Sequence, residues 1–170
     1  MNPVRVLVLA FHADFASSRV NRAWADAAEG VADQVLRIDG RSYRPGSYRE
    51  ACEAADRIVF QHPMHWYGPP WPMKRWIDQE LAFGWAYGDR MALAGKEWLD
   101  AVTVGAPLIE YGPEGSRRYT VEEFLRPLER TAGFIGMRWA EPFLWYRTGI
   151  LSDEELADSS AAYRQALRSE

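Results

Sequence analysis

The chain has 170 residues, of which 48% are hydrophobic and eight are tryptophan, and 20 basic against 24 acidic side chains give a net charge of −4. This size suits one domain with a sizeable core, so residues 1–170 are expected to form a single unit. No basic run longer than Arg117–Arg118 occurs, which argues against nucleic acid as the main partner. The single cysteine, Cys52, excludes an internal disulfide and any multi-cysteine metal site, and it is expected to be a small buried hydrophobe.

The N-terminal segment enters a strand-like run almost at once. It lacks the basic segment followed by an apolar stretch that marks a secretory leader. No apolar run approaches the roughly 20 residues of a membrane-spanning helix. We therefore expect a cytoplasmic protein.

The first part of the chain is expected to alternate strands with helices. Residues 4–10 are rich in β-branched and apolar side chains, which predicts a buried strand. Ser17 and Ser18 are candidate N-caps for a helix that ends near Gly30. The further elements expected in this part are strands at 34–38 and 57–61, a loop at 41–47 and a helix near 48–54.

A marked break in regular structure follows the third strand. Residues 61–68 read Gln-His-Pro-Met-His-Trp-Tyr-Gly, and helical periodicity begins at Trp71. A strand that breaks at a proline into an aromatic loop can present backbone N–H groups and flat rings to a planar ligand. The remaining expected elements are a helix at 71–81, a strand at 97–104, a helix at 120–134 opened by a capping box, a fifth strand at 137–145 that Pro142 weakens or ends, and a helix at 152–167 opened by a second capping box.

Five alternations of strand and helix indicate one fold class. Parallel strands need crossover connections, so the pattern predicts an α/β fold whose parallel sheet is covered by helices on both faces. Ligands in such folds bind outside the carboxyl ends of the strands, near a topological switch point. The candidate site loops are therefore residues 12–21, 63–68 and 103–115.

The first of these loops, residues 12–21, contains no glycine. This excludes a dinucleotide-binding Gly-x-Gly-x-x-Gly turn and a Walker phosphate loop. The loop still offers a helix N-terminus, two serine hydroxyls and Arg19, which together suit one phosphate group. The alternative is an ordinary capped loop with a surface arginine.

The other two loops suggest a planar ligand. The loop at 63–68 supplies backbone N–H groups for a ring carbonyl and the flat side chain of Trp66. A hydrophobic loop buried under the following helix is an equally open alternative. The loop that begins at Thr103 contains Gly105, where a ligand or another backbone could approach closely.

Four motifs together carry a resemblance to a known family. They are His12-x5-Ser18-x2-Asn21, residues 61–67, the segment Lys74-Arg75-Trp76-Ile77-Asp78, and the segment Phe83-Gly84-Trp85-Ala86-Tyr87-Gly88. The chain resembles the flavodoxin-like NAD(P)H:quinone oxidoreductases from Val4 to about Leu167. Its likeness is strongest to the bacterial branch that includes general quinone reductases and the ancillary oxidoreductases of glutathione-gated potassium efflux. The resemblance implies a three-layer sandwich with a five-stranded parallel sheet in the order 2-1-3-4-5.

The resemblance also implies a flavin site. FMN is the expected cofactor, FAD is the open alternative, and NAD(P)H is the co-substrate. Residues matching the loop that holds the phosphate and ribityl chain are His12, Ser18, Arg19, Val20 and Asn21. Residues matching the loop that holds the isoalloxazine ring are Pro63, Met64, His65, Trp66 and Tyr67, and those at its polar edge are Thr103, Val104, Gly105 and Ala106. Tyr111 lies where related quinone reductases carry a tyrosine suited to stabilising charge on the ring carbonyl.

Three positions depart from the family pattern. Val104 stands where a hydroxyl is usual, and Ala106 with Pro107 replaces a glycine at a position expected to need a positive φ. Arg117 stands where related enzymes can carry a histidine. An arginine there can stabilise negative charge but cannot relay a proton near neutral pH. Tyr111 and Arg117 are therefore the candidate catalytic residues, and the substrate range is left open.

The implied activity is ping-pong hydride transfer, in which NAD(P)H reduces the flavin, leaves, and is replaced by a quinone or similar acceptor. One alternative is a regulatory ancillary subunit of a potassium efflux transporter, peripheral to the inner face of the membrane, with weak or vestigial flavin activity. Another is a one-electron flavodoxin carrier, which a net charge of −4 without a strongly acidic docking face disfavours.

The resemblance further implies a homodimer with the site near its interface. The rings expected at that face are Trp71, Trp76, Phe83, Trp85 and Tyr87, which are too many for one small patch of monomer surface. The alternative is that they fill the monomer's own core.

Overall fold

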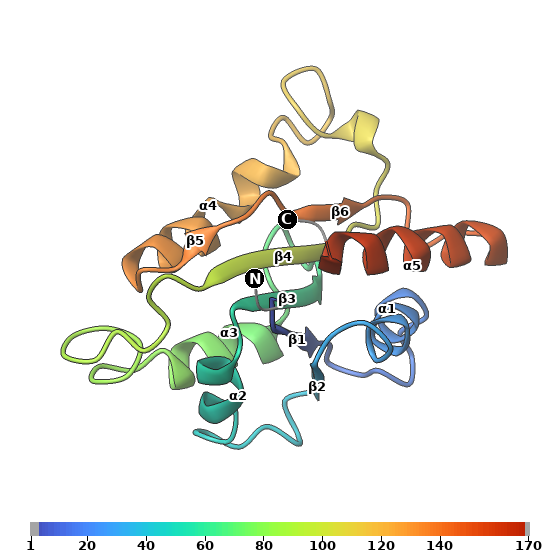
Figure 1. The fold of residues 1–170 in the computed structure, drawn as a ribbon. Coiled ribbons are helices and arrows are strands. Elements are labelled where there is room, and N and C mark those ends of the chain that lie inside the picture. Colours follow the sequence, from blue (N-terminus) through green and yellow to red (C-terminus); the bar gives the residue numbers. More distant parts are fainter. Residues whose placement is uncertain (1–3, 169–170) are drawn as a thin grey trace.

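The computed structural model describes residues 4–168, so residues 1–3 and 169–170 of the expected single domain lie outside the described residues. Strands alternate with helices along the chain, as the sequence pattern predicts (Figure 1). In chain order the elements are β1 (Val6–Phe11), α1 (Val20–Ala28), β2 (Gln34–Ile38), α2 (Arg49–Ala54), β3 (Arg57–Pro63), α3 (Trp71–Glu80), β4 (Glu97–Thr103), a 3₁₀ helix (Leu108–Glu110), α4 (Val121–Phe134), β5 (Arg138–Trp139), β6 (Phe143–Trp145) and α5 (Asp153–Arg168).

The strands form one parallel sheet in the order β2-β1-β3-β4-β5, with β6 also paired to β4. This is the order that the resemblance implies. The chain reverses direction across the sheet between β1 and β3, because β2 lies on one side of β1 and all later strands lie on the other. The carboxyl ends of β1, β3 and β4 therefore meet at one edge, where the three candidate loops begin.

The expected single fifth strand is wrong, since the structure divides residues 137–145 into two short strands. Trp139 pairs with Trp98 and Phe143 pairs with Ala101, so residues 140–142 lie opposite only two residues of β4. The extra residue makes a bulge in the edge strand. Pro142 lies within it and has no N–H to donate to the ladder, which explains why pairing stops there and resumes at β6.

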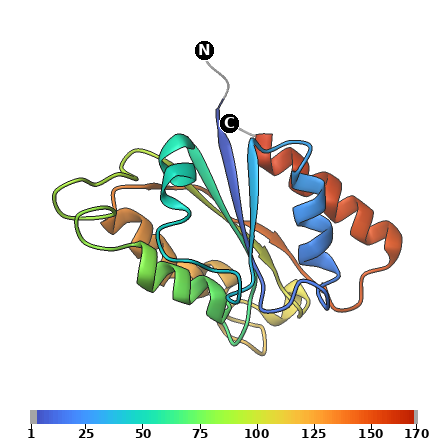
Figure 2. The same cartoon turned by 90° about the horizontal axis from the view of Figure 1, so that it is seen from below.

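Helices cover both faces of the sheet (Figure 2). Two hydrophobic clusters lie between the helices and the sheet, one on each face. Helices α2, α3 and α4 cover one face, and α1 and α5 cover the other. Side chains of a strand alternate between faces, so each strand contributes to both clusters. On β1, the first cluster takes Leu7, Leu9 and Phe11 and the second takes Val6, Val8 and Ala10. Cys52 is fully buried in the first cluster, as expected, and burial raises the pKa of its thiol to about 12.

Both predicted capping boxes are present. Thr120 Oγ1 accepts from Glu123 N at 3.2 Å, and Thr120 N donates to the Glu123 carboxylate at 2.8 Å. Ser152 and Glu155 make the same reciprocal pair at the start of α5, with N···O distances of 2.7 and 3.1 Å. These contacts satisfy backbone donors that the first helical turn would leave free.

The expected serine cap of α1 is wrong. The N-cap is Arg19, which is already in the right-handed helical conformation and makes no side-chain capping bond. Ser17 instead donates its hydroxyl to the carbonyl of Asp14 at 3.0 Å. The first-turn N–H groups of α1 are consequently not satisfied by a capping side chain.

Replacing Thr120 with alanine is expected to lower the free energy of unfolding by about 1 kcal/mol, because the Glu123 N–H loses its capping acceptor. Urea-induced unfolding measures this change. The matched control is Thr131→Ala in the same helix, where the hydroxyl only bonds back to the carbonyl of Pro127. The control should be neutral or slightly stabilising because alanine has the higher helix propensity, and equal losses in both variants would contradict the assignment.

The aromatic residues expected at a dimer face separate into two groups. Trp76 and Trp85 are buried, which fits the alternative that these two rings fill the monomer's own core. Trp71 and Phe83 are 53% and 67% exposed. Phe83 packs edge-on against Tyr87 with ring centroids 5.8 Å apart. Dimerisation therefore stays a prediction, and Trp71 and Phe83 are its remaining support.

No helix among residues 4–168 is long and apolar enough to cross a membrane. Within the same residues, no cluster of three or more histidine, cysteine or acidic side chains could hold a metal ion.

Candidate active site

The three candidate loops lie together at the carboxyl edge of the sheet. Asn21, in the first turn of α1, donates its side-chain amide to Thr103 Oγ1 at 2.8 Å, which joins the first loop to the end of β4. Met64 N donates to the carbonyl of Thr103 at 2.9 Å, which joins the loop after β3 to the same residue. The rings of His12 and His65 meet edge-on with centroids 6.2 Å apart. Segments separated by up to 82 residues in sequence thus form one surface.

The loop after β3 ends in a tight turn that exposes two aromatic rings. His65 and Gly68 exchange both backbone hydrogen bonds, at 2.9 and 3.1 Å. The two central residues, Trp66 and Tyr67, have positive φ values of 49° and 65°, as in a type I′ turn. Trp66 is 95% exposed, so its indole ring is open to a ligand or a partner. The alternative of a hydrophobic loop buried under the next helix is wrong for this ring.

A cavity of about 210 Å³ lies between the second and third loops. Its lining consists wholly of residues that the sequence had singled out for a ligand or for catalysis. They are Met64, Trp66, Tyr67, Gly105, Ala106, Tyr111 and Arg117. The cavity is therefore lined by aromatic rings, a thioether, backbone atoms of small residues and one cation.

The backbone of the cavity offers hydrogen-bond donors. The N–H groups of Trp66, Tyr67, Gly105 and Ala106 have no hydrogen-bond partner among the described residues. No atom lies within 4 Å of where a Cβ on Gly105 would be, so the approach to that backbone is open. Unpaired donors beside exposed rings suit a planar ligand with acceptor atoms on its edge.

Two larger hollows, of about 310 and 370 Å³, lie away from these loops. The first surrounds Arg57 and Glu97 at the opposite edge of the sheet, where these side chains pair with each other at 2.5 Å. The second lies between α1 and α5 beside Gly30 and Arg164. The smaller cavity is the better candidate because, unlike these two hollows, it lies at the carboxyl ends of the strands, where ligands bind in parallel α/β sheets.

Arg117 is held in a fixed position at the cavity. Its Nε and Nη2 both lie 2.9 Å from Glu110 Oε2, and its Nη1 donates to the Tyr67 hydroxyl at 2.9 Å. The guanidinium carbon also lies 5.5 Å from the centre of the Tyr111 ring and 5.8 Å from that of Tyr67. Cation–π contacts and the carboxylate together limit its movement. The hydrogen of Nη1 not used by Tyr67 is free for a ligand.

Tyr111 lies beside Arg117 in the wall of the cavity, with its ring next to the guanidinium group. Burial raises the pKa of the Tyr111 phenol above its ordinary value of 10.0, although the charge of Arg117 acts in the opposite direction. The phenol therefore keeps its proton at neutral pH and can donate a hydrogen bond. Phe124 and Tyr146 support this residue, with ring centroids 6.5 and 5.8 Å away.

His12 lies in the first loop, at the end of the site away from Arg117. Its Nδ1 accepts from Asp14 N at 3.0 Å, which leaves the proton of the neutral ring on Nε2. Burial lowers the pKa of His12 below the ordinary 6.5, and the charge of His65 acts in the same direction. Burial likewise lowers the pKa of His65. Both rings are thus neutral donors and acceptors at pH 7.

The lowered histidine pKa values predict a pH dependence of stability. The unfolded chain binds these protons at higher pH than the folded chain does. The stability that the two neutral histidines contribute is therefore complete above pH 6.5 and declines as the pH falls from 6.5 through their lowered pKa values. Unfolding free energies measured from pH 8 to 5 should fall less steeply in a His12→Asn, His65→Asn variant. Equal slopes for the wild type and the variant would contradict this.

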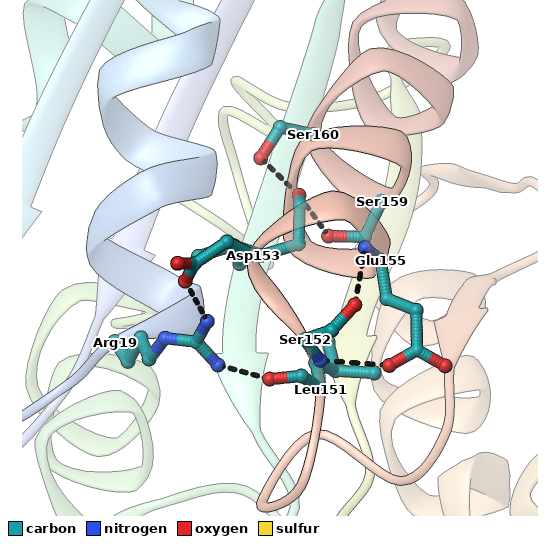
Figure 3. A network of polar contacts seen from close by, with 8 residues as sticks. Arg19, Leu151, Ser152, Asp153, Glu155, Ser159 and Ser160 are labelled. Carbon is teal, nitrogen blue, oxygen red and sulfur yellow. Dashed lines mark hydrogen bonds and ion pairs between the residues drawn. The ribbon is translucent and has the colours of Figure 1, made fainter.

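Arg19 points toward α5 in the structure (Figure 3). Its Nη1 donates to the carbonyl of Leu151 at 2.5 Å, and its Nη2 lies 2.6 Å from the Asp153 carboxylate. These bonds direct the guanidinium to Leu151 and Asp153, so the phosphate role of Arg19 stays a prediction. The Ser18 hydroxyl and the first-turn N–H groups of Val20 and Asn21 remain available for an anion.

The departures from the family pattern cause no visible strain. Val104 is fully buried, and its N–H donates to the carbonyl of Trp145 at 2.8 Å. The carbonyl of Ala106 accepts from Arg147 N at 3.2 Å. The positive φ expected at Ala106 is wrong, because the non-glycine residues with positive φ in the described chain are Trp66, Tyr67, Met91, Arg118 and Arg147.

Comparison with known proteins agrees with the fold. A family described by its flavodoxin-like fold matches residues 4–169. The chain belongs to this family. It is 34% identical over 169 residues to the uncharacterized NAD(P)H oxidoreductase YdeQ of Bacillus subtilis, which covers 96% of this chain and 86% of that protein. It is 33% identical over 174 residues to the glutathione-regulated potassium-efflux system ancillary protein KefG of Pectobacterium carotovorum, covering 98% and 94%.

Solved structures of similar chains share the flavodoxin-like fold. A crystal structure of a thermophilic tryptophan halogenase, Th-Hal, from Streptomycin violaceusniger has a TM-score of 0.91 at 38% identity, covering 96% of this chain and 99% of the other. A crystal structure of general stress protein 14 from Treponema denticola in complex with FMN has a TM-score of 0.86 at 28% identity, covering 96% and 97%.

Two aromatic residues that support this candidate site were not foreseen from the sequence. Phe124 on α4 packs against Tyr67 with centroids 4.8 Å apart, and Tyr146 follows β6 and packs against Tyr111. Both are distant in sequence from the loops that they support. Phe124 lies four residues after the Thr120 cap, but nothing local to it or to Tyr146 indicates a role at the site.

Proposed function

We propose that the chain is an FMN-dependent NAD(P)H:quinone oxidoreductase. The observation that supports this most is the cavity of about 210 Å³, which combines four unpaired N–H donors with exposed rings at the carboxyl edge of the sheet. Relatives named as NAD(P)H oxidoreductases and a similar chain in complex with FMN point the same way.

The residues of the chain fit this cofactor by the chemistry of their donors. The N–H groups of Trp66, Tyr67, Gly105 and Ala106 would pair with the carbonyl and nitrogen acceptors on the edge of the isoalloxazine ring, and Trp66 would lie along its face. The Ser18 hydroxyl and the start of α1 would hold the phosphate. The chemistry that FMN supplies when bound is hydride transfer from NAD(P)H to a quinone.

The side chains around the cavity would stabilise negative charge on the cofactor and limit how substrates enter. Tyr111 would donate a hydrogen bond to a ring carbonyl of the bound cofactor, and Arg117 would add a fixed positive charge beside it. Neither residue needs to change its protonation state for this role. The cavity is small, so NAD(P)H and the acceptor would enter in turn, which is the basis for expecting ping-pong kinetics.

Purified protein loaded with FMN tests this function. The expected result is a yellow protein whose visible absorption bleaches with NADPH or NADH without air and returns when a quinone is added. Initial rates at several quinone concentrations should give parallel double-reciprocal lines. Protein that takes up neither FMN nor FAD would sink the proposal. Flavin that is reduced only by a separate reductase would favour the one-electron carrier.

Replacing Arg117 with methionine is expected to lower kcat/KM for the quinone by about 100-fold, the smaller loss seen when one charge-stabilising donor is removed. Methionine keeps the apolar stem and removes the charge. Stopped-flow reoxidation of the reduced protein by a quinone measures the effect. The control is Arg118→Met at the exposed neighbouring position, and equal losses in both variants would contradict a specific role for Arg117.

The likeness to KefG favours a second candidate function, a cytoplasmic ancillary subunit that binds a potassium efflux transporter at the inner face of the membrane. Exposed apolar side chains such as Trp66 and Ile109 suit a docking surface. Co-purification with such a transporter, together with no quinone turnover, would favour this candidate. Equilibrium sedimentation tests the homodimer in either case.

A further inference from the structure

Two fully buried polar side chains, His62 and Asp100, lie beneath the candidate site. His62 is on β3, directly before Pro63, and Asp100 is on β4. Both are 0% exposed on the sheet face that α3 and α4 cover, among apolar neighbours such as Phe60 and Trp98. Burying such groups costs free energy unless partners satisfy them, so their contacts indicate what they do.

The contacts fix the tautomer of His62. Its Nδ1 lies 3.1 Å from the carbonyl of Pro63, and a carbonyl only accepts, so Nδ1 carries a proton. Its Nε2 lies 3.8 Å from Asp100 Oδ1, too far for a hydrogen bond, and that oxygen accepts from the Trp98 indole N–H at 2.9 Å. His62 Nε2 and Asp100 Oδ2 have no hydrogen-bond partner within the described part of the chain. The imidazole therefore spans the space from the carboxylate to one backbone carbonyl.

That carbonyl belongs to the peptide unit that opens the candidate flavin loop. The carbonyl of Pro63 is held by His62, and the N–H of the same unit, from Met64, donates to the carbonyl of Thr103 at 2.9 Å. Both polar groups of this peptide are thus fixed. The turn three residues later holds Trp66 and Tyr67 at positive φ, a conformation that persists only where the surroundings restrain it.

We propose that His62 is a positioning residue whose ring, packed beside Asp100 in this core, holds the Pro63–Met64 peptide and so keeps the loop at 64–68 in its ligand-binding shape. The FMN part of this inference rests on the proposed function. An uncharged pair of similar size that keeps an acceptor for the Trp98 indole N–H would pack in this core at little cost to the fold, so a purely structural role predicts no effect on the loop when the pair is replaced.

The test compares variants that keep or remove the Nδ1 donor. His62→Asn keeps an N–H close to the position of Nδ1, and the double variant His62→Phe, Asp100→Asn removes the imidazole and the carboxylate charge while an amide oxygen still accepts from the Trp98 indole N–H. Amide hydrogen exchange at Met64 in FMN-free protein is the first readout. FMN affinity, from quenching of flavin fluorescence, is the second.

In the double variant, exchange at Met64 should accelerate and the dissociation constant for FMN should rise about tenfold, the equivalent of one net hydrogen bond, while thermal stability stays close to that of the wild type. His62→Asn should restore both values toward wild type. Unchanged exchange at Met64 in a folded double variant would overturn the proposal. If wild-type protein binds no FMN, the proposed function fails, and the exchange result still tests the positioning role.

A measurement on the wild type needs no variant. The ¹⁵N chemical shifts of the His62 ring should show a protonated Nδ1. An unprotonated Nδ1 would overturn the proposal, because the bond to the Pro63 carbonyl could not exist.

Discussion

Replacing Gly105 with leucine is expected to weaken FMN binding by a factor of about 100 or more, equivalent to about 2.7 kcal/mol, while the fold stays intact. Gly105 lines the cavity, and a Cβ there would meet no atom within 4 Å. Its φ is not in the positive range, so leucine can adopt the backbone conformation without strain. The added side chain would occupy space in a cavity of only about 210 Å³.

Fluorescence titration of flavin-free protein with FMN measures this loss, and circular dichroism checks the fold. Gly30→Leu is the matched control, because Gly30 also has no atom within 4 Å of a Cβ, lacks a positive φ and lies outside the three loops. The control should bind FMN as the wild type does. If Gly105→Leu bound FMN with wild-type affinity, the isoalloxazine ring would have to bind elsewhere.

Replacing Glu80 with alanine is expected to lower the free energy of unfolding by about 3 kcal/mol, as when one partner is removed from a buried charged network. Glu80 is 0% exposed at the end of α3. Its Oε1 accepts from the Tyr43 hydroxyl at 3.1 Å and from Gly46 N at 2.6 Å, and its Oε2 accepts from Arg49 Nε at 3.2 Å. Alanine would leave these three donors without their acceptor and would release the loop before α2.

Urea-induced unfolding again supplies the measurement. Glu80→Gln is the conservative control, because its amide oxygen still accepts from Gly46 N, and it should lose less than the alanine variant. The Tyr43 phenol gives an independent readout. Burial and the Glu80 charge raise its pKa well above the ordinary 10.0, so phenol ionisation in Glu80→Ala should move to lower pH. A stability loss below about 1 kcal/mol, the size of one ordinary hydrogen bond, would contradict this account.

The strands were predictable from the sequence for local reasons. An uninterrupted apolar run predicts a strand buried on both faces, and the β1 residues Val6–Phe11 are all buried. Capping boxes depend on residues three apart, which explains why the starts of α4 and α5 were foreseen. The rule that ligands bind at the carboxyl ends of parallel strands indicated the loops, and the resemblance supplied the strand order.

The errors in the prediction come from contacts between distant segments. Ser17 and Ser18 have good local capping preferences, but the chain enters α1 at Arg19, whose side chain bonds 132 and 134 residues away. The division of the fifth strand depends on its register with β4 as well as on Pro142. The role of Phe124 could not be read locally, because it packs against a loop far away in sequence.

Amide hydrogen exchange of the flavin-free protein with and without FMN tests the central claim most directly, since it maps binding onto the backbone. The account predicts protection at the N–H groups of Trp66, Tyr67, Gly105 and Ala106, together with the first turn of α1. Protection confined to the hollows beside Arg57 or Gly30, or no protection at saturating FMN, would contradict it.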